Sequence, residues 1–126
     1  MVVDREEVSR IGAGMAVLLG ISKDDGPDEA RRMAEKLSRL RIFEDREGKM
    51  NEPLGQREIL CVSQFTLYAD TSSGNRPGFH DAAPGELAEP LYEDVCRRLD
   101  ARMGVFGAQM TVEISGDGPV TILIEV

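Results

Sequence analysis

A chain of 126 residues has the length of one compact domain, and residues 1–126 are expected to form a single domain. Hydrophobic residues make up 41% of the sequence and charged residues 30%, which excludes a disordered chain. The formal net charge of −8 argues against DNA as a partner, because DNA binding requires cations that neutralise many phosphates. A protein that holds only the end of an RNA needs no more than a local basic patch, so this class stays open.

The expected location is the cytoplasm. Charged residues occupy positions 4–7, where a signal peptide would need an apolar core. The longest apolar run, residues 15–21, has the length of a strand and falls short of the roughly 18 residues that span a membrane. We therefore expect no membrane partner.

The first half of the chain predicts a buried strand followed by a helix. Residues 14–22 are mostly apolar with glycines near both ends, which is typical of a buried strand. The turn at 24–27 ends in a proline that a first helical turn accepts, and acidic residues follow it. Apolar residues then recur at helical spacing as far as Leu40. A short strand is expected at 41–43.

The second half predicts another strand, a long loop and a second helix. Residues 59–63 fit a buried strand, and residues 65–69 are expected to continue it after a break. Residues 70–83 have neither a helical nor a strand period, and loops of this length often carry function. Pro84 opens a helix with an apolar face.

The C-terminal residues alternate between apolar and polar. Residues 110–115 and 120–126 each show this period of two and are separated by a short connection, so they predict an antiparallel hairpin. The expected fold is therefore α+β, a mostly antiparallel sheet or partial β-barrel covered by two helices.

No common catalytic motif is present. The sequence contains no nucleophile elbow and no glycine-rich phosphate loop, and Gly12 to Gly14 is best explained as a turn. His80 is either a general base or a solvated loop residue. Cys61 and Cys96 are expected to be reduced and packed rather than disulfide-bonded. With one histidine and no paired ligand spacing, we expect neither a metal nor another cofactor.

Two short segments stand out. Ser63, Gln64 and Thr66 place polar side chains in an apolar stretch, which indicates either a strand with one wet face or a site. Gly118 and Pro119 mark either a plain turn or a strand start, and a bond before proline is also one that can be cis.

With its neighbours, this pair of segments resembles the bacterial D-aminoacyl-tRNA deacylase family over nearly the whole chain. The blocks that carry the resemblance keep the family's order, and they are residues 14–20, 36–37 together with 40–45, 48–51, 62–70, 74–79, 82–84, 106–108 and 117–121. A single tetrapeptide would be weak support, whereas eight ordered regions are specific.

The resemblance implies a homodimer with active sites at the subunit interface and the 3′ end of aminoacyl-tRNA as partner. Its catalytic strand in one subunit would comprise Ser63, Gln64, Phe65 and Thr66. The other subunit would supply Gly118 and Pro119, whose carbonyls in the family accept a D-configured α-carbon and exclude an L side chain. Further contacts to substrate or the tRNA end would come from Phe106, Gly107, Ala108, Met110 and Arg76.

The implied reaction is hydrolysis of the ester that joins a D-amino acid to tRNA, a proofreading step in translation. Glycine has no handedness, so mischarged glycyl-tRNA is also an expected substrate. Thr66 acts either as a nucleophile or through its backbone, with the substrate's own 2′-hydroxyl assisting water; the resemblance favours the second role. The rival classes are a catalytically impaired module that binds the tRNA end and a hydrolase of small esters.

The chain departs from the family's pattern in four places. The family's first strand, about a dozen residues that carry an arginine near the proline loop, has no counterpart here. Gly116 replaces a usual asparagine, Gly78 replaces a usual serine, and residues 52–57 are shorter than typical. The missing strand would leave a sheet edge open.

Overall fold

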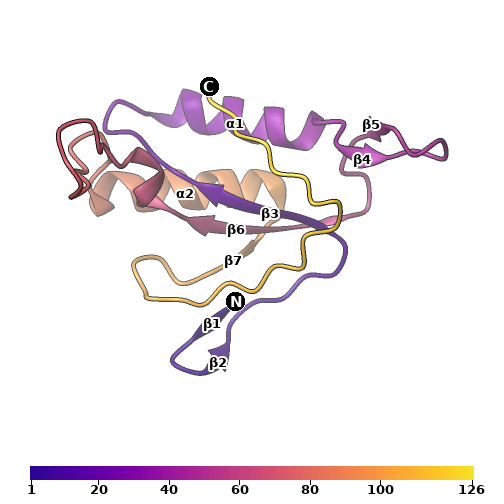
Figure 1. Cartoon of the computed structure of the whole chain (residues 1–126), viewed down its shortest axis with the longest axis horizontal. Coiled ribbons are helices and arrows are strands. Elements are labelled where there is room, and N and C mark those ends of the chain that lie inside the picture. The colour runs from indigo at the N-terminus through magenta and orange to yellow at the C-terminus, as the bar shows by residue number, and fades with distance from the viewer.

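A parallel three-stranded sheet forms the centre of the computed structural model, which describes all residues from Met1 to Val126 (Figure 1). Its strands lie in the order β3 (Gly14–Leu19), β6 (Glu58–Ser63) and β7 (Arg102–Met103), and both pairings are parallel. The helices α1 (Pro27–Arg39) and α2 (Gly85–Leu99) pack on one face of this sheet.

The main core lies between the sheet and the helices. Met15 and Leu19 of β3 and Ile59 and Cys61 of β6 point into it, because alternate residues of a strand share a face. Buried residues of α1 and α2 complete this core: Ala30, Ala34, Leu37, Ala88, Leu91, Tyr92, Val95 and Cys96.

The opposite face of β6 carries a smaller cluster. Leu60 and Val62 pack there against Met1, and Met110 and Val112 lie partly buried beside them. Strand β6 is therefore buried on both faces, which accounts for its unbroken apolar run.

Four short strands pair outside the main sheet. Strands β1 (Val2–Val3) and β2 (Glu6–Glu7) form one antiparallel pair, and β4 (Phe43–Glu44) and β5 (Met50–Glu52) form another. The latter pair projects at the far end of the molecule from the tips of β3 and β6 (Figure 1).

The predicted α+β class, the two helices and strands in both predicted regions are confirmed, and β6 is buried as predicted. Strand β3 is buried only in part, with Leu18 44% exposed. The central sheet is parallel rather than antiparallel as predicted, and antiparallel pairing is found in the two small sheets. Helix α1 and the β4–β5 pair separate β3 from β6, and helix α2 separates β6 from β7. Such crossovers return the chain to the same end of the sheet, so neighbouring strands run parallel. The chain forms no closed barrel.

The predicted C-terminal hairpin is also absent. Residues 110–115 contribute one bridge, in which Val2 and Thr111 exchange backbone hydrogen bonds of 2.8 and 2.9 Å. Residues 120–126 form no strand and run across the sheet toward α1 (Figure 1). These residues make no ladder with the free edge of β3, and Leu123 remains 77% exposed.

The chain does not continue β6 beyond Gln64 as predicted; it turns into a 3₁₀ helix, η1 (Phe65–Tyr68). The Gln64 amide makes a 2.8 Å hydrogen bond to the Leu19 carbonyl, the last residue of β3. With β3 ended, a longer strand would have no partner on that side.

Glycine at position 14 is required by the close approach of β3 and β6. A Cβ there would lie 1.8 Å from the Glu58 carbonyl oxygen, which is backbone and has little freedom to move, whereas a Cβ at Gly12 would meet nothing within 4 Å. We expect Gly14→Ala to lower the free energy of unfolding by about 2 kcal/mol or more, and Gly12→Ala to change it little. Chemical denaturation of the two variants tests this, and equal stabilities would contradict the strand register.

Candidate active site

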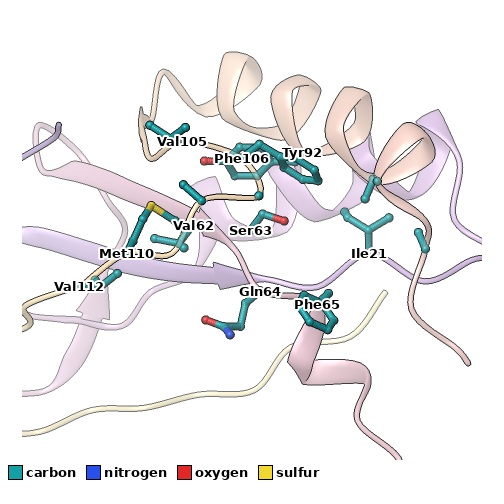
Figure 2. Close-up of a pocket in the computed structure, with 15 residues that line it drawn as sticks. Ile21, Val62, Ser63, Gln64, Phe65, Tyr92, Val105, Phe106, Met110 and Val112 are labelled. Carbon is teal, nitrogen blue, oxygen red and sulfur yellow. The ribbon is translucent and has the colours of Figure 1, made fainter. Parts of the chain in front are cut away.

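A pocket of about 360 Å³ opens beside the end of β6 (Figure 2). Its lining is mostly apolar and includes seven of the residues singled out from the sequence: Ser63, Gln64, Phe65, Phe106, Gly107, Ala108 and Met110. The sequence-predicted strand and the segment 106–110 are therefore brought together within one chain.

The carboxyl end of β6 forms one wall of the pocket. Ser63 is the last residue of the strand and pairs with Leu19 of β3. Figure 2 shows the Ser63 hydroxyl directed toward Phe106 and Tyr92, while the Gln64 side chain points the other way. Ligands of open parallel sheets commonly bind beyond this edge, where the strands end and loops begin.

The turn after Ser63 presents backbone donors. Phe65 and Thr66 begin η1, and the first N–H groups of a helix have no partner within it. The Gln64 side-chain amide donates a 2.5 Å hydrogen bond to the Thr66 hydroxyl, which holds the two side chains together across the turn. The site thus offers fixed N–H groups beside an apolar pocket.

The segment after β7 forms the opposite wall. Gly107 has a φ of +77°, a conformation that favours glycine, and the Ala108 amide closes the turn on the Val105 carbonyl at 3.1 Å. The Phe106 ring packs on Tyr92, with ring centroids 5.9 Å apart.

Tyr92 of α2 connects the two walls. Its hydroxyl donates to the Cys61 carbonyl at 2.7 Å and accepts from the Gly104 amide at 3.3 Å. Burial is the main cause that raises the pKa of Tyr92, so it stays protonated and acts as a hydrogen-bond bridge. In the sequence, Tyr92 is one of several residues on the apolar face of its helix, and its bridging role is hidden because both of its partners are backbone groups that no side-chain pattern reveals.

Four of the predicted site residues do not line the pocket. Thr66 lies just beyond it in η1, and Arg76 stands in the exposed loop 70–83. Gly118 and Pro119, joined by a cis peptide bond, belong to the exposed C-terminal segment. From the family resemblance, we expect Gly118 and Pro119 to contribute to the active site of another subunit.

The remaining candidates of the sequence analysis lie elsewhere. Cys61 and Cys96 are free, fully buried thiols; their mutual hydrogen bond and burial raise the pKa of Cys61. His80 is an exposed loop residue 3.4 Å from an Asp81 carboxylate oxygen. No three potential metal ligands gather anywhere in the chain, and neither helix has the length and apolar surface needed to cross a membrane.

Comparison with known proteins identifies the family to which this fold belongs. The family model described as D-Tyr-tRNA(Tyr) deacylase matches residues 1–125. The D-aminoacyl-tRNA deacylases of Anaeromyxobacter dehalogenans and Chlorobaculum parvum are each 51% identical to the chain. These matches cover 98% and 95% of the chain, and 87% and 86% of the respective relatives. The chain belongs to the D-Tyr-tRNA(Tyr) deacylase family, which confirms the resemblance found in the sequence.

Solved structures agree on the fold. A structure described as c-Myc DNA unwinding element binding protein superposes with a TM-score of 0.89 at 45% identity, covering 96% of this chain and 87% of the other. A probable eukaryotic D-amino acid tRNA deacylase gives a TM-score of 0.64 at 22% identity, covering 78% of this chain and 59% of the other, which supports the fold alone.

The Tyr92 bridge predicts a measurable contribution to stability. Tyr92→Phe removes both hydroxyl contacts and leaves the ring in place, so we expect the free energy of unfolding to fall by about 1–2 kcal/mol. Tyr68→Phe is the matched control, because the Tyr68 hydroxyl makes no hydrogen bond within the chain. Thermal and urea unfolding of both variants check this. An equally small effect of both changes would contradict the claim that the Tyr92 hydroxyl stabilises the fold through its two hydrogen bonds.

Proposed function

We propose that this protein hydrolyses the ester bond of D-aminoacyl-tRNA, releasing the D-amino acid and free tRNA as a proofreading step in translation. The observation that carries the proposal is the pocket beside Ser63, Gln64 and Phe65, with two free backbone N–H groups at its edge, in a chain that belongs to a deacylase family. Mischarged glycyl-tRNA is a second proposed substrate, because glycine has no side chain that a site selective for D residues could exclude.

In this proposal, backbone amides make the main contribution to catalysis by stabilising the transition state. Attack on the ester carbonyl builds negative charge on its oxygen, and fixed donors aimed at that position stabilise the transition state. The N–H groups of Phe65 and Thr66 are the donors that the turn after β6 leaves free. An ester is already activated, so this chemistry needs no metal or other cofactor.

The surroundings of Thr66 favour a backbone role over a nucleophilic one. A nucleophilic hydroxyl requires a neighbouring base to take its proton. The side-chain partner of the Thr66 hydroxyl is the Gln64 amide, which donates a hydrogen bond and is not a base. The proposed nucleophile is therefore water, which attacks the ester carbonyl with help from the 2′-hydroxyl of the terminal ribose.

The proposed assembly is a homodimer in which Gly118 and Pro119 of one subunit complete the site of the other. Their backbone carbonyls would contact only atoms common to all amino acids, so the site would reject L residues while it accepts many side chains. The exposed apolar residues of the C-terminal segment are consistent with coverage by a second subunit: Ile114, Val120, Ile122, Leu123 and Val126. The cytoplasm, where aminoacyl-tRNA is used, is the proposed location.

The terminal nucleotide of the tRNA has a proposed place in the same pocket. Phe106, Gly107, Ala108 and Met110 form an apolar wall facing the Ser63 corner, which suits an adenosine base. Because the wall lies within the same chain as the backbone donors, it would position the ester relative to them.

The direct test uses purified protein with D-tyrosyl-tRNA and L-tyrosyl-tRNA in separate reactions. We expect release of D-tyrosine at a rate at least about a hundredfold above that of L-tyrosine, because exclusion of the L side chain would cost about 3 kcal/mol of transition-state binding. Binding of tRNA without cleavage would instead support the impaired-module alternative. Equal cleavage of D-tyrosine methyl ester and D-tyrosyl-tRNA would support a small-ester hydrolase.

A further inference from the structure

Two exposed aromatic rings meet just outside the pocket. Phe65 lines the pocket mouth and is 56% exposed, while Phe79, from the loop 70–83, is 36% exposed and lies outside the lining. Their ring centroids are 5.0 Å apart in an edge-to-face arrangement. Large exposed aromatic side chains are costly in water, so a paired set beside a site indicates a binding surface.

The loop that carries Phe79 has a fixed base. Asp70 and Gly78 exchange two backbone hydrogen bonds of 2.8 Å, which close the loop across residues 71–77. The Asp70 carboxylate accepts hydrogen bonds from the Ser72 amide and hydroxyl, and these lower its pKa. This arrangement holds Phe79 against Phe65 before any ligand arrives.

The loop also supplies the local positive charge. Arg76 is the one lysine or arginine between Arg57 and Arg97. It is exposed and makes no ion pair or side-chain hydrogen bond within the chain, so its guanidinium is free for a phosphate. His80 and the carboxylates of Asp70 and Asp81 lie at the loop's base, where they contact one another.

We propose that Phe65, Phe79 and Arg76 form a platform for the nucleotide that precedes the terminal adenosine of the tRNA, with its base stacked on the rings and its phosphate on the guanidinium. The inference rests on the proposed function, since it follows the RNA outward from the esterified end in the pocket. Aromatic stacking combined with one cation is the general way that proteins hold single-stranded RNA without reading its sequence. In a chain of net charge −8, a single free arginine at the site is consistent with a grip on the RNA end alone.

The test measures binding of an RNA hairpin that has a single-stranded 3′ tail and carries no amino acid. In this tail, 2-aminopurine replaces the base before the terminal adenosine. Stacking quenches this fluorophore, so we expect wild-type protein to quench it. Phe79→Leu should abolish the quenching and weaken binding about tenfold, and Phe79→Trp should restore both. Met50→Ala, at an exposed apolar residue of the distant β5 strand, is the matched control.

The charge contribution is read from the salt dependence of the same binding. Arg76→Gln should make the slope of log Kd against log salt shallower by about 0.7, the value for one phosphate contact on a single strand. Arg46→Gln should leave the slope unchanged, because Arg46 lies in the turn between β4 and β5 at the other end of the molecule (Figure 1).

Two results would overturn the platform. One is unchanged quenching and affinity in Phe79→Leu; the other is a weaker affinity that sedimentation traces to loss of subunit association, which would assign the rings to a protein contact. Because the RNA carries no amino acid, it has no ester to cleave, and its binding does not depend on catalysis. Wild-type protein that quenches the probe but fails to cleave D-tyrosyl-tRNA would remove the proposed function and leave the platform standing.

Discussion

The parallel pairing of β3 with β6 fixes the edge of the sheet at which both strands end, and with it the position of the turn that forms the candidate site. Six residue pairs hold it, from Gly14 beside Glu58 to Leu19 beside Ser63. Because parallel strands point the same way, both end at one edge, and the Gln64 amide makes its hydrogen bond to the Leu19 carbonyl there. The chain must then turn, and the turn exposes the N–H groups on which the proposed chemistry depends.

The second requirement is a wall that faces this turn at a fixed distance. Strand β7 pairs with β6, and the chain beyond it returns toward the strand ends as the Phe106–Met110 segment. Tyr92 joins the helix layer to both, through the Cys61 carbonyl on β6 and the Gly104 amide after β7. Sheet pairing therefore places the site, and one buried hydroxyl maintains the separation of its two walls.

Local features of the sequence were enough to predict the two helices and the positions of the two longest strands, β3 and β6. Helical spacing and a proline in the first turn mark α1, and the unbroken apolar run at 59–62 marks β6, which is buried on both faces. The direction of strand pairing was not predictable in this way, because it depends on where the crossovers lead the chain. The C-terminal alternation predicts a hairpin, yet residues 120–126 form no strand and leave the outer edge of β3 unpaired.

The same distinction holds for the site. Ser63 and Gln64 were noticeable because polar residues interrupt an apolar strand, and seven predicted residues do line one pocket. Tyr92 could not be found, since a tyrosine on an apolar helix face looks like an ordinary core residue until its backbone partners are known. The role of η1 was also hidden, because residues 65–69 have a composition that suits a strand as well as a turn.

The central claim is that backbone amides at the turn after β6, rather than the Thr66 hydroxyl, stabilise the transition state. The most direct measurement is turnover of D-tyrosyl-tRNA by Thr66→Ala and by Thr66→Pro, each checked for folding by its unfolding curve. Proline removes the N–H in the first turn of a helix, where it is tolerated. If the backbone amides act in this way, Thr66→Ala has near-normal turnover and Thr66→Pro loses about a hundredfold or more. An inactive Thr66→Ala, or an active Thr66→Pro, would contradict it.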